Sequence, residues 1–211
     1  MNSNAFESAQ SRLVLASTSR YRAELLRRLT PDFCCIGPEV DETPLPDEPP
    51  EVLAVRLARA KSQAVAAGAG DNALVIGSDQ VLICEGEALG KPEAHARALA
   101  MLRGLSGRDA EFHTAVCVTD TRTGRTEGFV DCWRVRYRTL SDADIERYLM
   151  LDAPFDCAGA IRTEAHGPLL LDKIEGGDPS ALIGLPLVPL AACLRRMGLD
   201  LLHASHLPRE A

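Results

Sequence analysis

The stretch that most constrains the fold is residues 75–92, VIGSDQVLICEGEALGKP, which combines a strand, a turn, a carboxylate and an ammonium group. Residues 73–76 form a short apolar run typical of a buried strand, and Gly77-Ser78 follows it. We therefore expect the strand to end there, with Asp79 at its carboxyl end. In an open α/β sheet, ligands usually bind beyond such strand ends.

The residues after Asp79 predict a hairpin. Residues 81–84 form a second extended run, residues 85–87 form a turn, and the chain then returns to Lys91. The return would carry Lys91 back toward Asp79 and create a candidate ligand site. A turn aspartate beside a solvated lysine has the same spacing, so at this point both interpretations stay open.

Length and charge limit the class of protein. A chain of 211 residues supports one good core, either as a single domain or as two lobes that share a cleft. The formal net charge of −7 argues against a protein that coats nucleic acid, because that binding requires a basic surface. A small anionic ligand remains compatible, since a few cations in a cleft can focus a local positive potential.

The cysteines and the chain ends indicate a cytoplasmic protein without a membrane partner. The seven cysteines are scattered, with no CxxC spacing, so they predict reduced thiols and no zinc site. The polar opening lacks an apolar signal core, and no run reaches membrane-spanning length. We expect a disordered lead-in over residues 1–11, one domain over 12–200 and a flexible tail over 201–211.

The first unit reads as a strand, a polar loop and a helix. Residues 13–16 are apolar, and Ser17 and Ser19 precede a helical pattern. Serines at a helix start can cap its free amides, and the same amides can bind an anion. Arg20 and Arg22 oppose the helix dipole there, which indicates either an anionic ligand or simple solvation.

The remaining elements predict an α/β fold with a mixed, twisted sheet and flanking helices. A proline-rich loop carries Glu42, for which a solvated surface position is the simplest interpretation. Lys61 lies in the following helix, where the helix dipole alone explains a lysine. Further helices are expected at residues 50–67, 93–105, from 141, and at 187–197, and further strands at 33–36, 113–119 and 129–137.

Seven short motifs then resemble one known family over residues 13–197. They are LASTSRYRAELL at 15–26, EVDET at 39–43, LARAKSQA at 57–64, IGSDQV at 76–81, GKP at 90–92, CAGA at 157–160 and GLPL at 184–187. In this order and spacing they resemble the Maf family of nucleotide pyrophosphatases. IGSDQV and CAGAIRTE look most like the branch that acts on 7-methyl-GTP, because the dTTP/UTP branch typically has a threonine after the aspartate and a later glutamine.

The resemblance implies a Maf/ITPase-like fold with two lobes around a nucleotide-binding cleft. It also implies hydrolysis between the α and β phosphates, with a divalent cation, Mg²⁺ or Mn²⁺, as cofactor. Asp79 would be either the base that deprotonates the attacking water or a metal ligand, and Glu42 would assist it in either role. Contacts to the triphosphate would come from Arg22, Lys61, Lys91, Ser17 and Ser19.

Three further residues bear on the choice of base. 7-Methylguanine is cationic and presents two hydrogen-bond donors, which Glu164 could accept while balancing the charge. Tyr21 could stack on the ring, a contact worth about 1–3 kcal/mol, and Gln80 could add an amide contact. A uracil or thymine edge would set a carbonyl oxygen against Glu164, which penalises binding.

The chain departs from the family pattern in the first loop. Arg20 and Ala23 stand where the family often has a proline and a second arginine, and Tyr21 stands where this branch commonly has a tryptophan. Beside 7-methyl-GTP hydrolysis, two alternatives stay open: the same chemistry on dTTP or UTP, or a nucleotide-binding regulator of division with little turnover. A homodimer is the default oligomeric state for such an enzyme.

Overall fold

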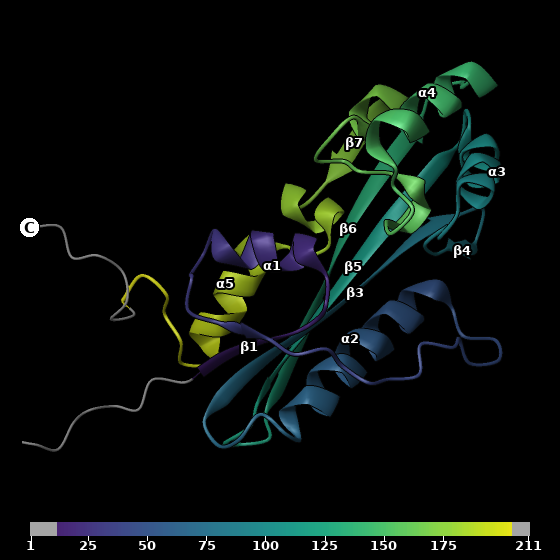
Figure 1. Cartoon of the computed structure of the whole chain (residues 1–211). Coiled ribbons are helices and arrows are strands. Elements are labelled where there is room, and N and C mark those ends of the chain that lie inside the picture. The colour runs from purple at the N-terminus through teal and green to yellow at the C-terminus, as the bar shows by residue number, and fades with distance from the viewer. Residues whose placement is uncertain (1–11, 204–211) are drawn as a thin grey trace, which may run out of the picture.

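The computed structural model describes residues 12–203 of the chain. The expected lead-in over residues 1–11 and the tail from residue 204 onward lie outside the described residues. The core is a seven-stranded mixed sheet in the order β2-β1-β3-β5-β6-β7, with β4 paired to β3 (Figure 1). The strands are β1 (Arg12–Ala16), β2 (Cys34–Cys35), β3 (Ala73–Cys84), β4 (Glu87–Leu89), β5 (Asp109–Asp120), β6 (Thr126–Tyr137) and β7 (Leu171–Gly176). Strands β1, β2 and β3 are parallel where they pair, and the other pairs are antiparallel.

Helices cover both faces of this sheet. Helices α1 (Arg20–Arg27) and α5 (Leu187–Arg196) bury an apolar cluster near β1, and α3 (His95–Leu105) and α4 (Asp142–Asp152) bury another near the far end of β5 and β6. Helix α2 (Pro50–Ala66) packs on the opposite face, against Val81, Ala115 and Cys117. The two ends of the sheet, each with its own helices, form the two expected lobes (Figure 1). Within residues 12–203, no helix has the length and apolar character needed to cross a membrane.

Strand β3 is central in the sheet, and the expectation that it ends at Gly77-Ser78 was wrong. β3 is one 12-residue strand that continues through Gly77-Ser78, so Asp79 lies inside the strand and not at its end. The reason is pairing: β5 bonds to β3 without interruption from Leu74 to Ile83, which overrides the local break. On its other edge β3 pairs with β1 as far as Gly77 and with β4 from Leu82. Asp79 therefore lies in the gap between two short neighbouring strands.

Gly77 allows α2 to approach this gap closely. A Cβ at position 77 would lie 2.6 Å from the backbone nitrogen of Ser62 and closer still to the carbonyl oxygen of Ala58, both on α2. Only glycine accommodates such contact with another backbone. Because side chains alternate along a strand, Gly77 and Asp79 both face α2.

The other local predictions agree with the structure in kind and differ in extent. The hairpin forms between β3 and β4, and Ser141 and Asp144 form a capping box at the start of α4. The strand expected at 33–36 is only Cys34–Cys35, and the helix expected from residue 93 begins at His95. The described part of the chain also contains three 3-10 helices, η1 (Ala158–Ala160), η2 (Gly167–Leu170) and η3 (Pro179–Ile183).

Candidate active site

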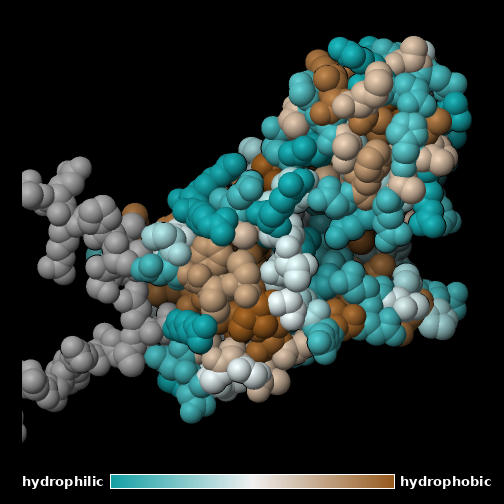
Figure 2. Space-filling view, in the orientation of Figure 1, coloured by the Kyte–Doolittle hydropathy of each residue, from teal (hydrophilic) through white to brown (hydrophobic). Residues whose placement is uncertain are grey.

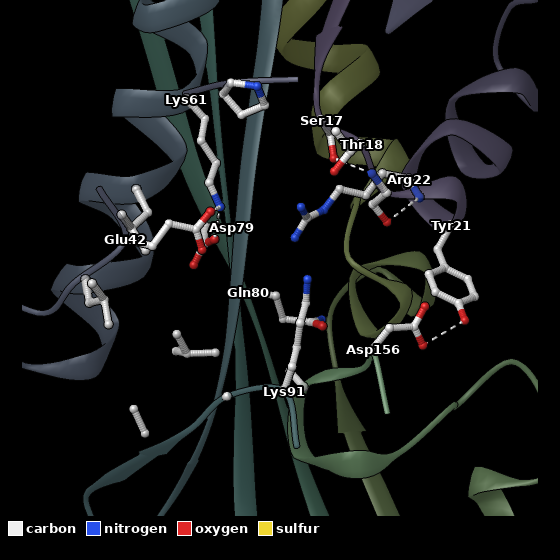
Figure 3. A pocket seen from close by; sticks show the side chains of 18 of the residues that line it. Ser17, Thr18, Tyr21, Arg22, Glu42, Lys61, Asp79, Gln80, Lys91 and Asp156 are labelled. Atoms are coloured by element: carbon white, nitrogen blue, oxygen red, sulfur yellow. Dashed lines mark hydrogen bonds and ion pairs between the residues drawn. The ribbon is translucent and has the colours of Figure 1, made fainter. Parts of the chain in front are cut away.

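A cavity of about 740 Å³ opens beside β3, at the gap between β1 and β4. Its walls come from the loop before α1, from the proline-rich loop that carries Glu42, from α2, from β3 with the β3–β4 hairpin, and from the segment before η1. Figure 2 shows the surface hollowed between α2 and the lobe that carries β4, and Figure 3 shows the side chains that line the cavity. The cavity therefore gathers residues from five separate parts of the sequence.

Two carboxylates share one lysine on the α2 side of the cavity. The Lys61 Nζ atom lies 2.6 Å from Asp79 Oδ1 and 2.7 Å from Glu42 Oε1. Lys61 and Asp79 are only 6 % and 7 % exposed. Burial raises the pKa of the Asp79 carboxyl above its ordinary value, and the Lys61 ammonium opposes that rise. A buried carboxylate whose proton affinity is raised in this way is suited to proton transfer.

The loop that carries Glu42 is fixed to α2 by Arg56. The Arg56 guanidinium donates to both carboxylate oxygens of Glu48, at 2.6 and 2.8 Å, and to the Thr43 carbonyl oxygen at 3.0 Å. The Glu42 side chain is 59 % exposed but is nevertheless bound to Lys61. Glu42 is therefore not simply solvated, and the helix dipole alone does not explain Lys61, because the two residues form an ion pair.

Arg22 projects into the cavity opposite this cluster (Figure 3). Its Nε donates to the Gly184 carbonyl oxygen at 3.0 Å, and the Ser78 hydroxyl donates to the same oxygen at 2.9 Å. Gly184 has a φ of 115° and lies against the Arg22 side chain, so a glycine is required there. Ser19 caps α1 by accepting from the Arg22 amide at 3.4 Å, and Ser17 accepts from the Ser19 amide at 3.1 Å.

Lys91 reaches the same space from the hairpin, whose return was expected to carry it toward Asp79 (Figure 3). The adjacent Gly90 carbonyl oxygen accepts from the Gly159 amide at 3.1 Å. Gly159 has a φ of 68°, and any Cβ there would overlap the Leu82 side chain. The CAGA segment thus holds the hairpin return that carries Lys91.

Glu164 lies in a smaller adjoining cavity of about 70 Å³, which also borders Tyr21, Gln80 and Lys91. The structure brings together all ten residues expected from the sequence, in two cavities that share a wall. The amide nitrogen of Gln80 is already engaged, since it donates to the Ala181 carbonyl oxygen at 2.7 Å and to Thr114 at 2.9 Å. Only the carbonyl oxygen of Gln80 is therefore left for a ligand.

Sequence reasoning missed two charged residues beside Tyr21. Asp156 borders both cavities and accepts from the Tyr21 hydroxyl at 3.2 Å. The Arg162 guanidinium lies 5.4 Å from the centre of the Tyr21 ring and donates to Glu164 Oε1 at 3.1 Å. A guanidinium of Arg20 also lies over that ring, at 4.7 Å. Asp156 and Arg162 flank the CAGA motif, which was the available signal.

The family model for Maf-like proteins matches residues 12–197. The chain belongs to the Maf family. A 7-methyl-GTP pyrophosphatase of Burkholderia pseudomallei (strain 1710b) is 52 % identical to this Maf protein over 195 residues, covering 92 % of this chain and 91 % of the relative. The 7-methyl-GTP pyrophosphatase of Paraburkholderia xenovorans (strain LB400) is 49 % identical over 195 residues, covering 92 % of this chain and 95 % of the relative.

The solved structure of the Staphylococcus aureus Ham1 protein superposes on this Maf protein in part. The matched region covers 60 % of this chain and 71 % of the Ham1 chain. The TM-score is 0.45 and the sequence identity 20 %, a partial likeness that has no bearing on function.

The donor set of this Maf protein fits a divalent cation that binds together with its substrate. Within residues 12–203, no three His, Cys, Asp or Glu side chains cluster in a way that could hold a metal alone. Asp79 and Glu42, however, gather around one ammonium group, and Mg²⁺ is commonly bound by one or two carboxylates plus substrate phosphates. The charged residues that line the larger cavity balance: Arg20, Arg22, Lys61 and Lys91 against Glu42, Asp79, Glu93 and Asp156. A triphosphate would therefore bring uncompensated negative charge, which a cation would offset.

Proposed function

We propose that this Maf protein hydrolyses 7-methyl-GTP to 7-methyl-GMP and diphosphate, and so clears a modified nucleotide. The observation that carries the proposal is the pairing of two sites. A carboxylate–lysine cluster faces Arg22 and Lys91 in one cavity, and Glu164 lies in the cavity that adjoins it. The names of the relatives, which are about 50 % identical over most of the chain, support the same substrate.

In the proposed reaction, Asp79 accepts the proton of a water molecule that attacks the α-phosphorus. The bond from that phosphorus to the α–β bridging oxygen breaks, and diphosphate leaves with the bond electrons. Lys61 holds Asp79 in place and opposes the rise in the pKa of Asp79 that burial causes. Arg22 and Lys91 face the developing negative charge of the leaving group, where fixed cations contribute most.

Mg²⁺ or Mn²⁺ is the proposed cofactor, and Glu42 and phosphate oxygens would hold it while Asp79 acts as the base. When bound, the cation would supply Lewis-acid polarisation of the phosphate and neutralise part of its charge. Lys61 contacts both carboxylates and so orients them.

Glu164 is the proposed selector of the base. Its side chain is 25 % exposed and borders the adjoining cavity with Tyr21 and Gln80. A carboxylate accepts the two donor groups of 7-methylguanine and balances its positive charge, whereas uracil or thymine would place a carbonyl oxygen against it. This contrast favours 7-methyl-GTP over the alternative substrates dTTP and UTP.

A homodimer is the proposed assembly, and β7 offers a surface for it. Within residues 12–203, β7 is an edge strand whose backbone pairs only with β6, and Lys173, Ile174 and Glu175 are exposed. An antiparallel pair of β7 strands centred on Ile174 would set Lys173 opposite Glu175 of the second copy. The K173E variant should weaken such a dimer in light scattering, and K173E/E175K should restore it. Dimerisation unaffected by K173E would contradict this surface.

The cytoplasm is the proposed compartment, since the cysteines among the described residues are all free thiols.

The test of function is diphosphate release from 7-methyl-GTP, GTP, dTTP and UTP, with Mg²⁺ or Mn²⁺. Selective turnover of the methylated nucleotide supports the proposal. A preference for dTTP or UTP would keep the reaction and overturn the assignment of Glu164. Tight binding of nucleotides without turnover would favour the second candidate, a nucleotide-binding regulator.

A further inference from the structure

Glu164 lies on a short turn that α4 holds at both ends. The turn spans residues 162–167 and closes on itself, because the Arg162 carbonyl oxygen accepts from the Gly167 amide at 2.9 Å and from the Ala165 amide at 3.2 Å. A Cβ on Gly167 would lie 2.7 Å from the Arg162 carbonyl carbon, so only glycine closes the turn this tightly. The backbone path of Glu164 is therefore strongly restricted.

Two polar side chains of α4 bind the ends of this turn. The Tyr148 hydroxyl accepts from the Arg162 amide at 2.8 Å. Asp152 accepts from the His166 amide at 3.0 Å and lies 2.5 Å from the His166 Nδ1 atom. Tyr148 and Asp152 are one helical turn apart, so they present their oxygens on the same face of α4.

Both anchoring side chains are buried, at 3 % exposure for Tyr148 and 7 % for Asp152. A buried carboxylate is costly unless it is hydrogen-bonded, and the partners of Asp152 belong to the turn. Helix α4 is itself fixed by a capping box and by Ile145 and Leu149 in the apolar cluster. The turn is thus attached to a rigid element and not merely packed against one.

Arg162 connects Tyr148 to the smaller cavity, which Glu164 and Tyr21 border. Its backbone is held by Tyr148, and its guanidinium donates to Glu164 Oε1 at 3.1 Å and lies over the Tyr21 ring. A displacement of Arg162 would therefore move both the carboxylate and the aromatic ring that border this cavity.

We propose that Tyr148 and Asp152 are positioning residues for base selection, acting on Glu164 through the 162–167 turn. This inference rests on the proposed role of Glu164. It predicts that a loosened anchor weakens recognition of the base while the phosphate-facing residues, which come from other elements, keep their function.

The test compares two buried tyrosines within residues 12–203, one whose hydroxyl is hydrogen-bonded and one whose hydroxyl is not. Tyr148→Phe removes the oxygen that anchors Arg162. Tyr137→Phe removes a buried hydroxyl that has no hydrogen-bond partner among the described residues. The assays are KM and kcat for 7-methyl-GTP and GTP, and inhibition by inorganic tripolyphosphate, which has no base.

We expect Tyr148→Phe to raise KM for 7-methyl-GTP about tenfold, the loss that follows one unpaired hydrogen-bonding group. The preference over GTP should fall by a similar factor, with kcat and tripolyphosphate inhibition unchanged. Tyr137→Phe should change none of these quantities. Asp152→Asn, which keeps one acceptor oxygen, should fall between the wild type and Asp152→Ala in the same preference ratio.

An unchanged preference ratio in both Tyr148→Phe and Asp152→Ala would overturn the inference. Equal weakening of 7-methyl-GTP and tripolyphosphate would also overturn it, because the effect would then not lie at the base. The base preference of the wild type shows whether the proposed substrate or the inference about Tyr148 and Asp152 has failed. If the wild type prefers another base, the substrate assignment fails, while the inference still requires Tyr148→Phe to erode whatever preference is measured.

Discussion

The contact between Gly77 and α2 provides a quantitative test of how the site is built. Gly77→Ala would place a methyl group 2.6 Å from the Ser62 nitrogen, where ordinary contacts are 3.4–4 Å. Helix α2 must then withdraw by about 1 Å, at a cost of about 1–3 kcal/mol in the free energy of unfolding. Because Lys61 lies on α2 and Asp79 on β3, their 2.6 Å contact would lengthen beyond hydrogen-bonding distance. A misplacement of this size lowers turnover by about 100-fold.

The assay for this prediction is urea unfolding followed by circular dichroism, beside kcat/KM for diphosphate release. The matched control is Gly104→Ala in α3, where an added Cβ meets no atom within 4 Å. That variant should be more stable by up to about 1 kcal/mol, with unchanged turnover. Wild-type stability in Gly77→Ala would refute the packing argument. Lost stability with full turnover would refute the claim that α2 positions Lys61 for catalysis.

Three further predictions test the charges of the site and its supporting loop. Lys61→Met should move the acid limb of the kcat/KM profile to higher pH. In the wild type the Lys61 ammonium lowers the pKa of Asp79, so removing it raises that pKa. An unmoved limb would contradict Asp79 as the base. Glu164→Gln should lower the preference for 7-methyl-GTP over GTP by about 10-fold or more, the loss expected for a charged hydrogen bond, and an unchanged ratio would remove Glu164 from base selection. The hydrogen bonds from Arg56 and from the Leu45 amide lower the pKa of Glu48 from 4.5 to about 2. The wild type should therefore exceed Glu48→Gln in unfolding free energy above pH 4.5, with the difference disappearing as the pH falls to about 2; a difference that persists at pH 2 would contradict this.

The sequence predicted the parts of the site that depend on local pattern. The hairpin from β3 to β4 followed from turn residues between two extended runs, and it brings Lys91 to the cavity. The capping serine of α1 and the apolar face of α2 were also legible, because capping and helical periodicity are short-range properties. These elements place most of the residues expected to contact a triphosphate.

The features that the sequence did not predict arise from long-range contacts. Gly77 looked like a strand end because a glycine commonly interrupts a strand, yet its pairing with β5 and its contact with α2 fix it inside β3. The Gly184 carbonyl oxygen holds Arg22 across 162 residues of sequence, and no local pattern encodes that contact. The anchor between Tyr148 and Arg162 is of the same kind, since it depends on where α4 packs.

Asp79 is the proposed base for the hydrolysis of 7-methyl-GTP between its α and β phosphates. The most direct measurement is chromatographic analysis of the products formed from 7-methyl-GTP by the wild type and by Asp79→Asn, in parallel with nucleotide binding. The wild type should release 7-methyl-GMP and diphosphate, and Asp79→Asn should bind the nucleotide but turn it over about 100- to 10,000-fold more slowly. Formation of 7-methyl-GDP and phosphate would contradict cleavage between the α and β phosphates, and full turnover by Asp79→Asn would contradict Asp79 as the base.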